Sequence, residues 1–105
     1  MITKLDKETL GEFTKNKIIV VEVFGNHCGP CQRMMPIFEK FEEEFKDRAT
    51  LGKIDMDENL QYLQEQFNID AIPTFIFYKD GIEVDRVVGA IAEDSLKMRI
   101  EFLID

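Results

Sequence analysis

The only two cysteines of the chain lie in the segment Phe24-Gly25-Asn26-His27-Cys28-Gly29-Pro30-Cys31-Gln32. Residues 18–24, which lead into it, are apolar and mostly β-branched, a composition typical of a central strand covered on both faces. From residue 31 to Phe45, apolar side chains recur at helical spacing and acidic ones lie on the other faces. We therefore predict that the cysteines lie where a buried strand passes into an amphipathic helix.

A thiol at the start of a helix is suited to nucleophilic chemistry. Unpaired backbone N–H groups and the positive end of the helix dipole favour the thiolate, which is the attacking species. With two residues between the cysteines, the second sulfur can reach the first within the opening turn and release a substrate held as a mixed disulfide. A C-x-x-C segment between a strand and a helix therefore indicates redox chemistry.

The same spacing also occurs in zinc sites, and two cysteines can be inert core residues. Cys28, Cys31 and the adjacent His27 do not complete the four-ligand set of a structural zinc site. A metal cluster shared between two copies of the chain stays open as an alternative. Pro30 favours a helix start over a zinc loop, because its fixed φ suits the first turn of a helix.

The rest of the chain predicts an alternation of strands and helices that ends in a hairpin and a final helix. Apolar periodicity indicates a short helix at 9–13 capped by Asp6, strands at 18–24, 51–56, 74–78 and 84–88, helices at 31–45 and 60–67, and a last helix opening at Ser95. Lys79-Asp80-Gly81 indicates a tight turn between the last two strands. Because no linker or repeat divides the sequence, we expect one domain over residues 1–105, with a mixed sheet and helices on both faces.

Composition and charge exclude several classes of function. The 105 residues are 45% hydrophobic and 32% charged, so the chain is expected to fold without a metal or a disulfide staple. The net charge of −8 opposes binding to nucleic acids and to anionic membrane surfaces. No stretch has the apolar length of a signal peptide or a membrane helix, so the cytoplasm is the expected location.

The segment Cys28-Gly29-Pro30-Cys31 resembles the active-site tetrapeptide of the thioredoxin family. Further motifs occur in the family's order: an apolar strand with one carboxylate, Lys53-Ile54-Asp55-Met56-Asp57, Ile72-Pro73-Thr74, Lys79-Asp80-Gly81 and Val88-Gly89. The resemblance spans nearly the whole chain. It implies the thioredoxin fold, an α/β fold in which four helices flank a central mixed β-sheet.

The resemblance also implies roles for individual residues. Cys28 would be the nucleophile, Cys31 the resolving thiol and Pro73 a cis-proline that faces the disulfide. The surface that receives extended polypeptide substrates would consist of Gly29, Pro30, Ile72, Pro73, Gly89 and Ala90. The implied activity is the reduction of protein disulfides without a cofactor, and the implied electron donor is a thioredoxin reductase that returns the protein to the dithiol form. We expect the chain to act as a monomer.

Two positions depart from the family pattern. His27 stands where thioredoxins usually carry Trp; an imidazolium there would favour the Cys28 thiolate, whereas a neutral ring would be a passive replacement. Glu22 stands where the family usually has a buried Asp. It is expected either to be buried, with a raised pKa and a role as general base for Cys31, or to reach solvent at the strand end. Lys53, in the motif of the next strand, is expected to modulate the site.

Two other functions are compatible with this fold. A disulfide oxidase or isomerase performs related chemistry, with a different dipeptide between the cysteines and after export. A non-catalytic binding module would hold a partner without thiol chemistry. The Gly29-Pro30 dipeptide and the retention of both thiols favour the reductase.

Overall fold

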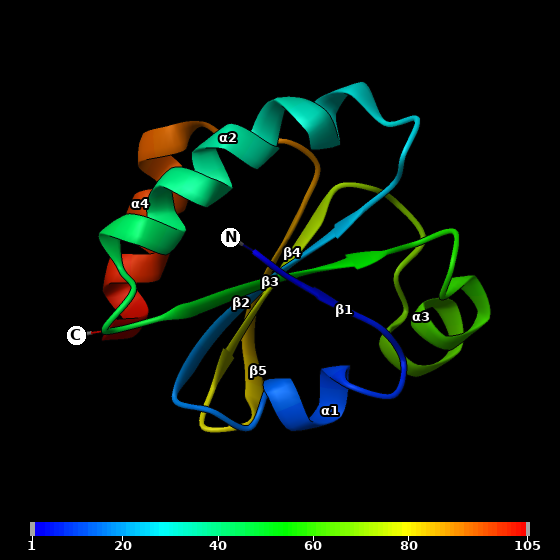
Figure 1. The fold of residues 1–105 in the computed structure, drawn as a ribbon, viewed down its shortest axis with the longest axis horizontal. Coiled ribbons are helices and arrows are strands. Elements are labelled where there is room, and N and C mark those ends of the chain that lie inside the picture. Colours follow the sequence, from blue (N-terminus) through cyan, green and yellow to red (C-terminus); the bar gives the residue numbers. More distant parts are fainter. Residues whose placement is uncertain (1, 105) are drawn as a thin grey trace.

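A five-stranded sheet with helices on both faces forms the framework of residues 2–104, the part of the chain that this computed structural model describes (Figure 1). The elements along the chain are β1 (Thr3–Leu5), α1 (Leu10–Phe13), β2 (Ile18–Phe24), α2 (Gly29–Glu44), β3 (Thr50–Asp55), α3 (Leu60–Phe67), β4 (Thr74–Lys79), β5 (Ile82–Val88) and α4 (Glu93–Ile104). The strand order is β1-β3-β2-β4-β5, and the first three strands are parallel while β4 and β5 run antiparallel to their neighbours. The predicted mixed sheet with four helices is confirmed.

The strand β2 lies in the middle of the sheet because both of its faces are apolar apart from Glu22. Six of its seven residues are buried. The helices α2 and α4 cover one face of the sheet, and α1 and α3 lie on the other (Figure 1). Val20 belongs to a core cluster with side chains of α2 and α4, and Val21 belongs to a cluster with side chains of α1 and α3. Burial of one large apolar side chain contributes about 1.5–3 kcal/mol. This two-sided packing fixes the end of β2, where the cysteine loop begins.

The strand β1 was not among the predicted elements. It has three residues, of which only Leu5 is buried, and it pairs in parallel with β3 at the edge of the sheet. Three residues are too few to show a period of two, and edge pairing leaves two of the three side chains in solvent. The strand is therefore defined by its partner and not by its own pattern.

Several element boundaries also differ from the prediction. The helix α4 begins at Glu93 instead of Ser95, and β5 begins at Ile82 instead of Val84. The N-cap of α1 is Thr9, while the Asp6 carboxylate accepts hydrogen bonds from the backbone N–H groups of Glu8 and Thr9 in the turn before it. Asp6 therefore stabilises the turn that leads into the helix and not the helix end itself. Its carboxylate accepts hydrogen bonds from backbone N–H groups there, as an N-cap side chain does at a helix start.

The hairpin between β4 and β5 has the predicted Asp-Gly turn and an unpredicted bulge. Asp80 and Gly81 both have positive φ, 54° and 85°, as a two-residue type I′ turn requires. Within the ladder, Phe77 pairs with Asp85 while Tyr78 pairs with Glu83, so Val84 is an extra residue on β5. The bulge shifts the register of this edge strand after Val84.

Candidate active site

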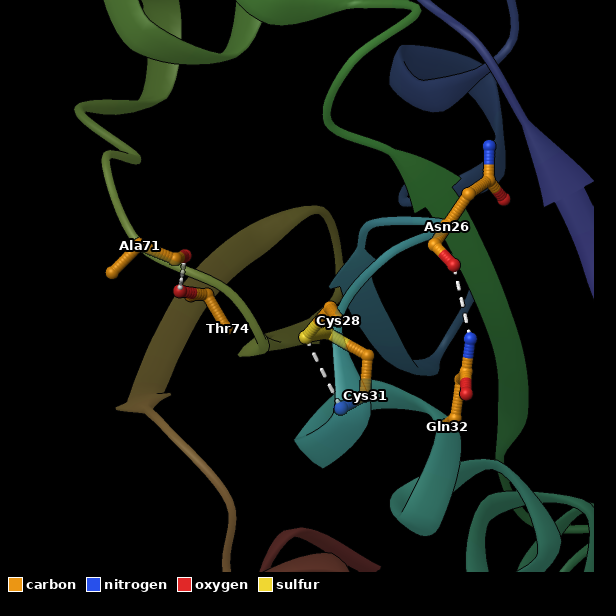
Figure 2. The surroundings of a disulfide bond; sticks show 6 residues. All are labelled: Asn26, Cys28, Cys31, Gln32, Ala71 and Thr74. Carbon is orange, nitrogen blue, oxygen red and sulfur yellow. Dashed lines mark hydrogen bonds between the residues drawn. A yellow bond between two sulfur atoms is a disulfide. The ribbon is translucent and has the colours of Figure 1, made fainter.

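The two cysteines lie in the turn from β2 into α2, with Cys28 as the N-cap of the helix. Cys28 has extended backbone angles, φ −112° and ψ 101°, and its sulfur accepts a hydrogen bond from the backbone N–H of Cys31 at 3.2 Å (Figure 2). Pro30 occupies the first turn, where its missing N–H leaves no helix hydrogen bond unmade. The predicted placement of a thiol against the free N–H groups of a helix start is confirmed.

Cys28 and Cys31 are joined by a disulfide, with their Cα atoms 5.3 Å apart. The two residues are buried to different degrees: Cys28 is 8% exposed and Cys31 is 1% exposed. Cys28 is therefore slightly more exposed than Cys31, although both residues belong to the buried core. The chain is in its oxidised form.

The segment around Pro73 lies against the cysteine loop. The Ile72-Pro73 peptide bond is cis, as the resemblance implied. The terminal carbon of Ile72 packs so close to Gly25 that a Cβ atom there would lie 2.5 Å from it, and the same Cβ would be 3.7 Å from the Cβ of Cys28. Gly25 therefore allows the Ile72 side chain to approach the backbone beside the reactive cysteine.

A second contact joins the cis-proline segment to the end of β5. The backbone N–H of Gly89 donates to the carbonyl of Pro73 at 2.7 Å. Gly89 has a φ of 96°, which suits glycine, and the following Ala90 is exposed. Figure 2 shows the turn before β4, in which the Thr74 hydroxyl donates to the carbonyl of Ala71 at 2.7 Å. The predicted substrate-binding residues thus come from three separate segments, and their binding role stays a prediction.

Glu22 is fully buried in the centre of the sheet, so the expectation that it is buried is met and the solvent-reaching alternative is wrong. Strand alternation puts Glu22 on the same face as Ile18 and Val20, the face that α2 covers. Neither of its carboxylate oxygens has a hydrogen-bond partner among residues 2–104. Burial raises the pKa of Glu22 to about 8, and the nearby Lys53 ammonium partly opposes this shift.

His27 and Lys53 occupy different surroundings. The side chain of His27 is exposed in the turn immediately before Cys28. Lys53 is opposite Glu22 in the β2–β3 register, and its Nζ atom lies 5.8 Å from the centre of the Phe24 ring. Lys53 is therefore placed to act on Glu22 through charge, whereas His27 can act on Cys28 only from the solvent side.

Three polar residues beside the cysteines were not predicted. Asn26 donates from its side-chain amide to Asp55 at 3.1 Å, and its carbonyl accepts from the amide of Gln32 at 2.9 Å. One feature of the sequence could have predicted the contact between Asn26 and Asp55. The carboxyl ends of neighbouring parallel strands meet at one edge of a sheet, so Asp55 at the end of β3 was bound to lie near the loop that follows β2.

Neither a metal-binding cluster nor a membrane-spanning helix is found among residues 2–104. No group of three or more His, Cys, Asp or Glu side chains in this part of the chain could hold a metal ion. Its helices are too short or too polar to cross a membrane.

The chain matches known proteins over most of its length. Residues 2–101 match the family model for thioredoxin. A thioredoxin of Chlamydia caviae is 35% identical over 96 residues, which are 91% of this chain and 92% of that protein. A mutant thioredoxin from Halobacterium salinarum has a TM-score of 0.90 at 32% identity, and the match covers 98% of this chain and 90% of that chain.

A further solved structure is described as the basis of the thiol resolving mechanism in yeast mitochondrial 1-Cys peroxiredoxin via glutathione/thioredoxin systems. It has a TM-score of 0.85 at 29% identity, and the match covers 96% of this chain and 94% of that chain. Fold, cysteine placement and sequence relationship agree. The chain belongs to the thioredoxin family, whose members are thiol-disulfide oxidoreductases that use a cysteine pair of their own chain and no bound cofactor.

Proposed function

We propose that this protein reduces disulfide bonds in other proteins, with Cys28 as the attacking thiol and Cys31 as the resolving thiol. The observation that supports these roles is the unequal burial of the pair at the start of α2, 8% exposed against 1%. In this proposal a bulky protein disulfide meets the more exposed residue, Cys28, first. The more deeply buried Cys31 then reacts with the sulfur of Cys28.

The proposed reaction has two exchange steps that transfer two electrons. The Cys28 thiolate attacks one sulfur of the substrate disulfide, forms a mixed disulfide and releases the other substrate sulfur as a thiolate. Cys31 then loses its proton and attacks the Cys28 sulfur, which forms the Cys28–Cys31 disulfide and releases the second substrate thiolate. A dithiol donor, which we propose is a thioredoxin reductase, reverses these steps on the oxidised pair.

We propose Glu22 as the base that accepts the Cys31 proton in the second step. Its carboxyl lies on the sheet face that α2 covers, and the cysteines begin that helix. A pKa of about 8 makes the carboxylate a stronger base than an exposed glutamate, while part of the population is still ionised near neutral pH. Lys53, whose charge opposes the rise in this pKa, is proposed as a modulating residue.

The substrate backbone is proposed to lie across Gly29, Pro30, Ile72, Pro73, Gly89 and Ala90. Small and apolar residues allow an extended chain to approach closely. Peroxiredoxins are proposed among the substrates, since a similar structure is described in the context of a 1-Cys peroxiredoxin. A cytoplasmic location is proposed because a lone redox pair needs a reducing compartment to act as a reductant. A monomeric state is proposed because the net charge of −8 opposes self-association.

Reduction of insulin disulfides by dithiothreitol, followed by turbidity, tests this function. The wild type should accelerate the reaction, and Cys28→Ser should abolish the acceleration. In a separate capture experiment without dithiothreitol, Cys31→Ser should retain partners as mixed disulfides that added dithiothreitol releases. Capture of partners by the Cys28 variant and not by the Cys31 variant would reverse the assigned roles. Failure of the wild type to accelerate the reaction would refute the function.

A further inference from the structure

The segment that carries both cysteines is closed by a hydrogen bond between its flanking residues. Asn26 lies two residues before Cys28, and Gln32 directly follows Cys31. The side-chain amide of Gln32 donates to the backbone carbonyl of Asn26 at 2.9 Å (Figure 2). This contact joins the loop after β2 to the first turn of α2 and encloses the redox pair.

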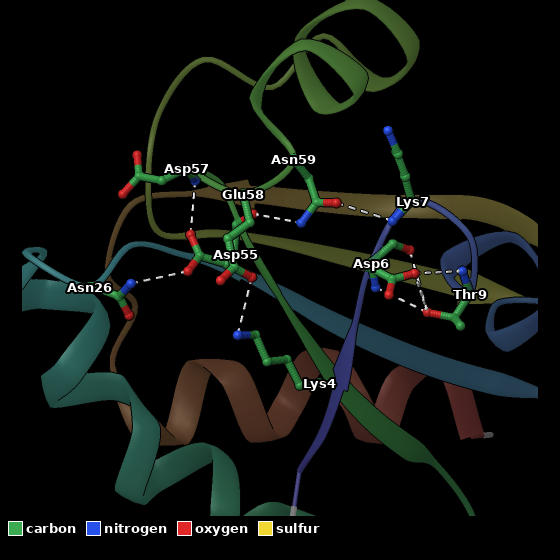
Figure 3. A network of polar contacts seen from close by, with 9 residues as sticks. All are labelled: Lys4, Asp6, Lys7, Thr9, Asn26, Asp55, Asp57, Glu58 and Asn59. Atoms are coloured by element: carbon green, nitrogen blue, oxygen red, sulfur yellow. Dashed lines mark hydrogen bonds and ion pairs between the residues drawn. The ribbon is translucent and has the colours of Figure 1, made fainter.

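Asn26 is held from its other side by a buried carboxylate. Its Nδ2 atom donates to Oδ2 of Asp55 at 3.1 Å (Figure 3). Asp55 is only 1% exposed and lies at the end of β3, opposite Phe24 of β2. We call Asn26, with its contacts to Asp55 and Gln32, the Asn26 clasp.

The Asp55 anchor is itself fixed by surrounding hydrogen bonds. Its Oδ1 atom accepts from the backbone N–H of Asp57 at 2.8 Å, and its carbonyl accepts from the side chain of Asn59 at 2.9 Å. Asn59 in turn accepts from the backbone N–H of Lys7 at 3.1 Å (Figure 3). The clasp therefore connects the cysteine loop to a hydrogen-bonded segment at the carboxyl end of β3.

The clasp matters most when the disulfide is open. In the oxidised protein the covalent bond between Cys28 and Cys31 already restricts the loop. In the dithiol and in the mixed disulfide that restriction is absent, and the contacts of Asn26 would then be what ties the loop before Cys28 to α2 and β3. Holding the loop in place lowers the entropy that is lost when the two sulfurs join.

We propose that Asn26, held by Asp55 and Gln32, is a positioning residue that keeps Cys31 within reach of the Cys28 sulfur and so favours disulfide formation. The inference rests on the roles assigned to Cys28 and Cys31 in the proposed function. A single hydrogen bond contributes a net ~0.5–1.5 kcal/mol. Loss of one clasp contact therefore slows resolution roughly threefold to tenfold, and a tenfold loss in the closing equilibrium raises the reduction potential by about 30 mV.

The test uses dithionitrobenzoate, whose reaction with the reduced protein separates the two steps. Attack by Cys28 releases one thionitrobenzoate, and attack by Cys31 on the mixed disulfide releases a second. Asn26→Ala removes the donor to Asp55 and keeps the backbone carbonyl of residue 26. Gln32→Met removes the donor to that carbonyl, and it does so at an exposed position with a side chain of similar size. Gln66→Met, on the exposed face of α3, is the matched control.

We expect both clasp variants to slow the second release roughly threefold to tenfold and to leave the first nearly unchanged. Their reduction potentials, measured in dithiothreitol buffers, should rise. Because the two contacts are coupled, the double variant should show a smaller effect than the sum of the effects of the two single variants. The Gln66→Met control should match the wild type in both measurements. Because the probe is a small molecule, these results do not depend on whether the protein reduces insulin.

Wild-type rates and potentials in both clasp variants would overturn the inference. Equal slowing of both releases would also overturn it, since a general disturbance of the loop would have that effect. Unfolding by denaturant, followed in the same variants, identifies any loss of stability that could mimic a positioning effect. Gln32→Met keeps the test decisive should Asn26→Ala fold poorly, because its side chain is on the surface.

Discussion

Two carboxylates are buried in neighbouring strands of this sheet, and they have opposite surroundings. Glu22 in β2 has no hydrogen-bond partner for either oxygen among residues 2–104, and its pKa is raised to about 8. Asp55 in β3 is just as buried, yet one oxygen accepts from Asn26 and the other from the backbone of Asp57. Burial disfavours a charge only where no donors replace the lost water. Glu22 is thus a group that can exchange a proton, and Asp55 is a structural anchor.

The largest effect is expected from Glu22→Gln on stability. Because the folded-state pKa of Glu22 is raised from 4.5 to about 8, wild-type stability falls as pH rises through this window and is constant above it. At 1.36 kcal/mol for each pH unit, the variant should be more stable by about 3 kcal/mol at pH 7 and by little below pH 4.5. Urea unfolding across pH measures the difference, with the exposed Glu39→Gln as control. A difference that does not vary with pH would contradict the raised pKa.

The same variant should slow the resolving step. If the Glu22 carboxylate accepts the Cys31 proton, replacing it should lower the rate of the resolving step about a hundredfold. This factor is the low end of what general base catalysis contributes. The second thionitrobenzoate release should depend on a group that titrates near pH 8 in the wild type and lose this dependence in Glu22→Gln. Identical pH profiles for the two proteins would exclude Glu22 as the base.

Replacement of Asp55 should have the opposite effect on stability. In Asp55→Ala the amide of Asn26 and the N–H of Asp57 lose their acceptor, which costs about 2 kcal/mol. Chemical denaturation of Asp55→Ala and of Asp57→Ala provides the comparison, since the Asp57 side chain is exposed and its removal should change stability by less than about 0.5 kcal/mol. Equal losses in the two variants would mean that the hydrogen bonds of Asp55 add nothing.

The smallest effect is expected from His27, an ionisable group that is not buried. Its side chain is exposed beside Cys28, so solvent screens its charge. Replacement by Ala should change the alkylation rate of Cys28 by less than about threefold at any pH between 5 and 9. Iodoacetamide labelling of the reduced proteins measures this rate. A tenfold change would give His27 a direct part in activating the thiol.

Sequence reasoning found the elements whose patterns are long and repetitive. The seven-residue run of β2, the stripe of α2 and the Asp-Gly turn each have a local signal, and all three are present in the structure. The strand β1 and the bulge at Val84 depend on pairing with a neighbour, which local patterns do not reveal. One domain over residues 1–105 stays a prediction.

The site residues also fall into two groups, those that local sequence patterns predict and those that depend on contacts between distant segments. Cys28, Cys31 and the burial of Glu22 follow from a motif and an apolar run, whereas Asn26 looks like an ordinary turn residue in the sequence. Its contacts join segments 29 residues apart, from Asn26 to Asp55, and depend on the strand order β3-β2. The cis bond before Pro73 came from the family resemblance, because the residues alone allow either isomer.

The bulge in β5 has a consequence for the behaviour of the protein at high concentration. Edge strands present free N–H and C=O groups on which other chains can add strands and begin to aggregate. On β5 this hazard is increased by exposed Ile82, Val84 and Val88. The extra residue at Val84 twists the strand and interrupts the even spacing that an added strand would need, so the edge is a poor template for fibril growth despite its apolar side chains.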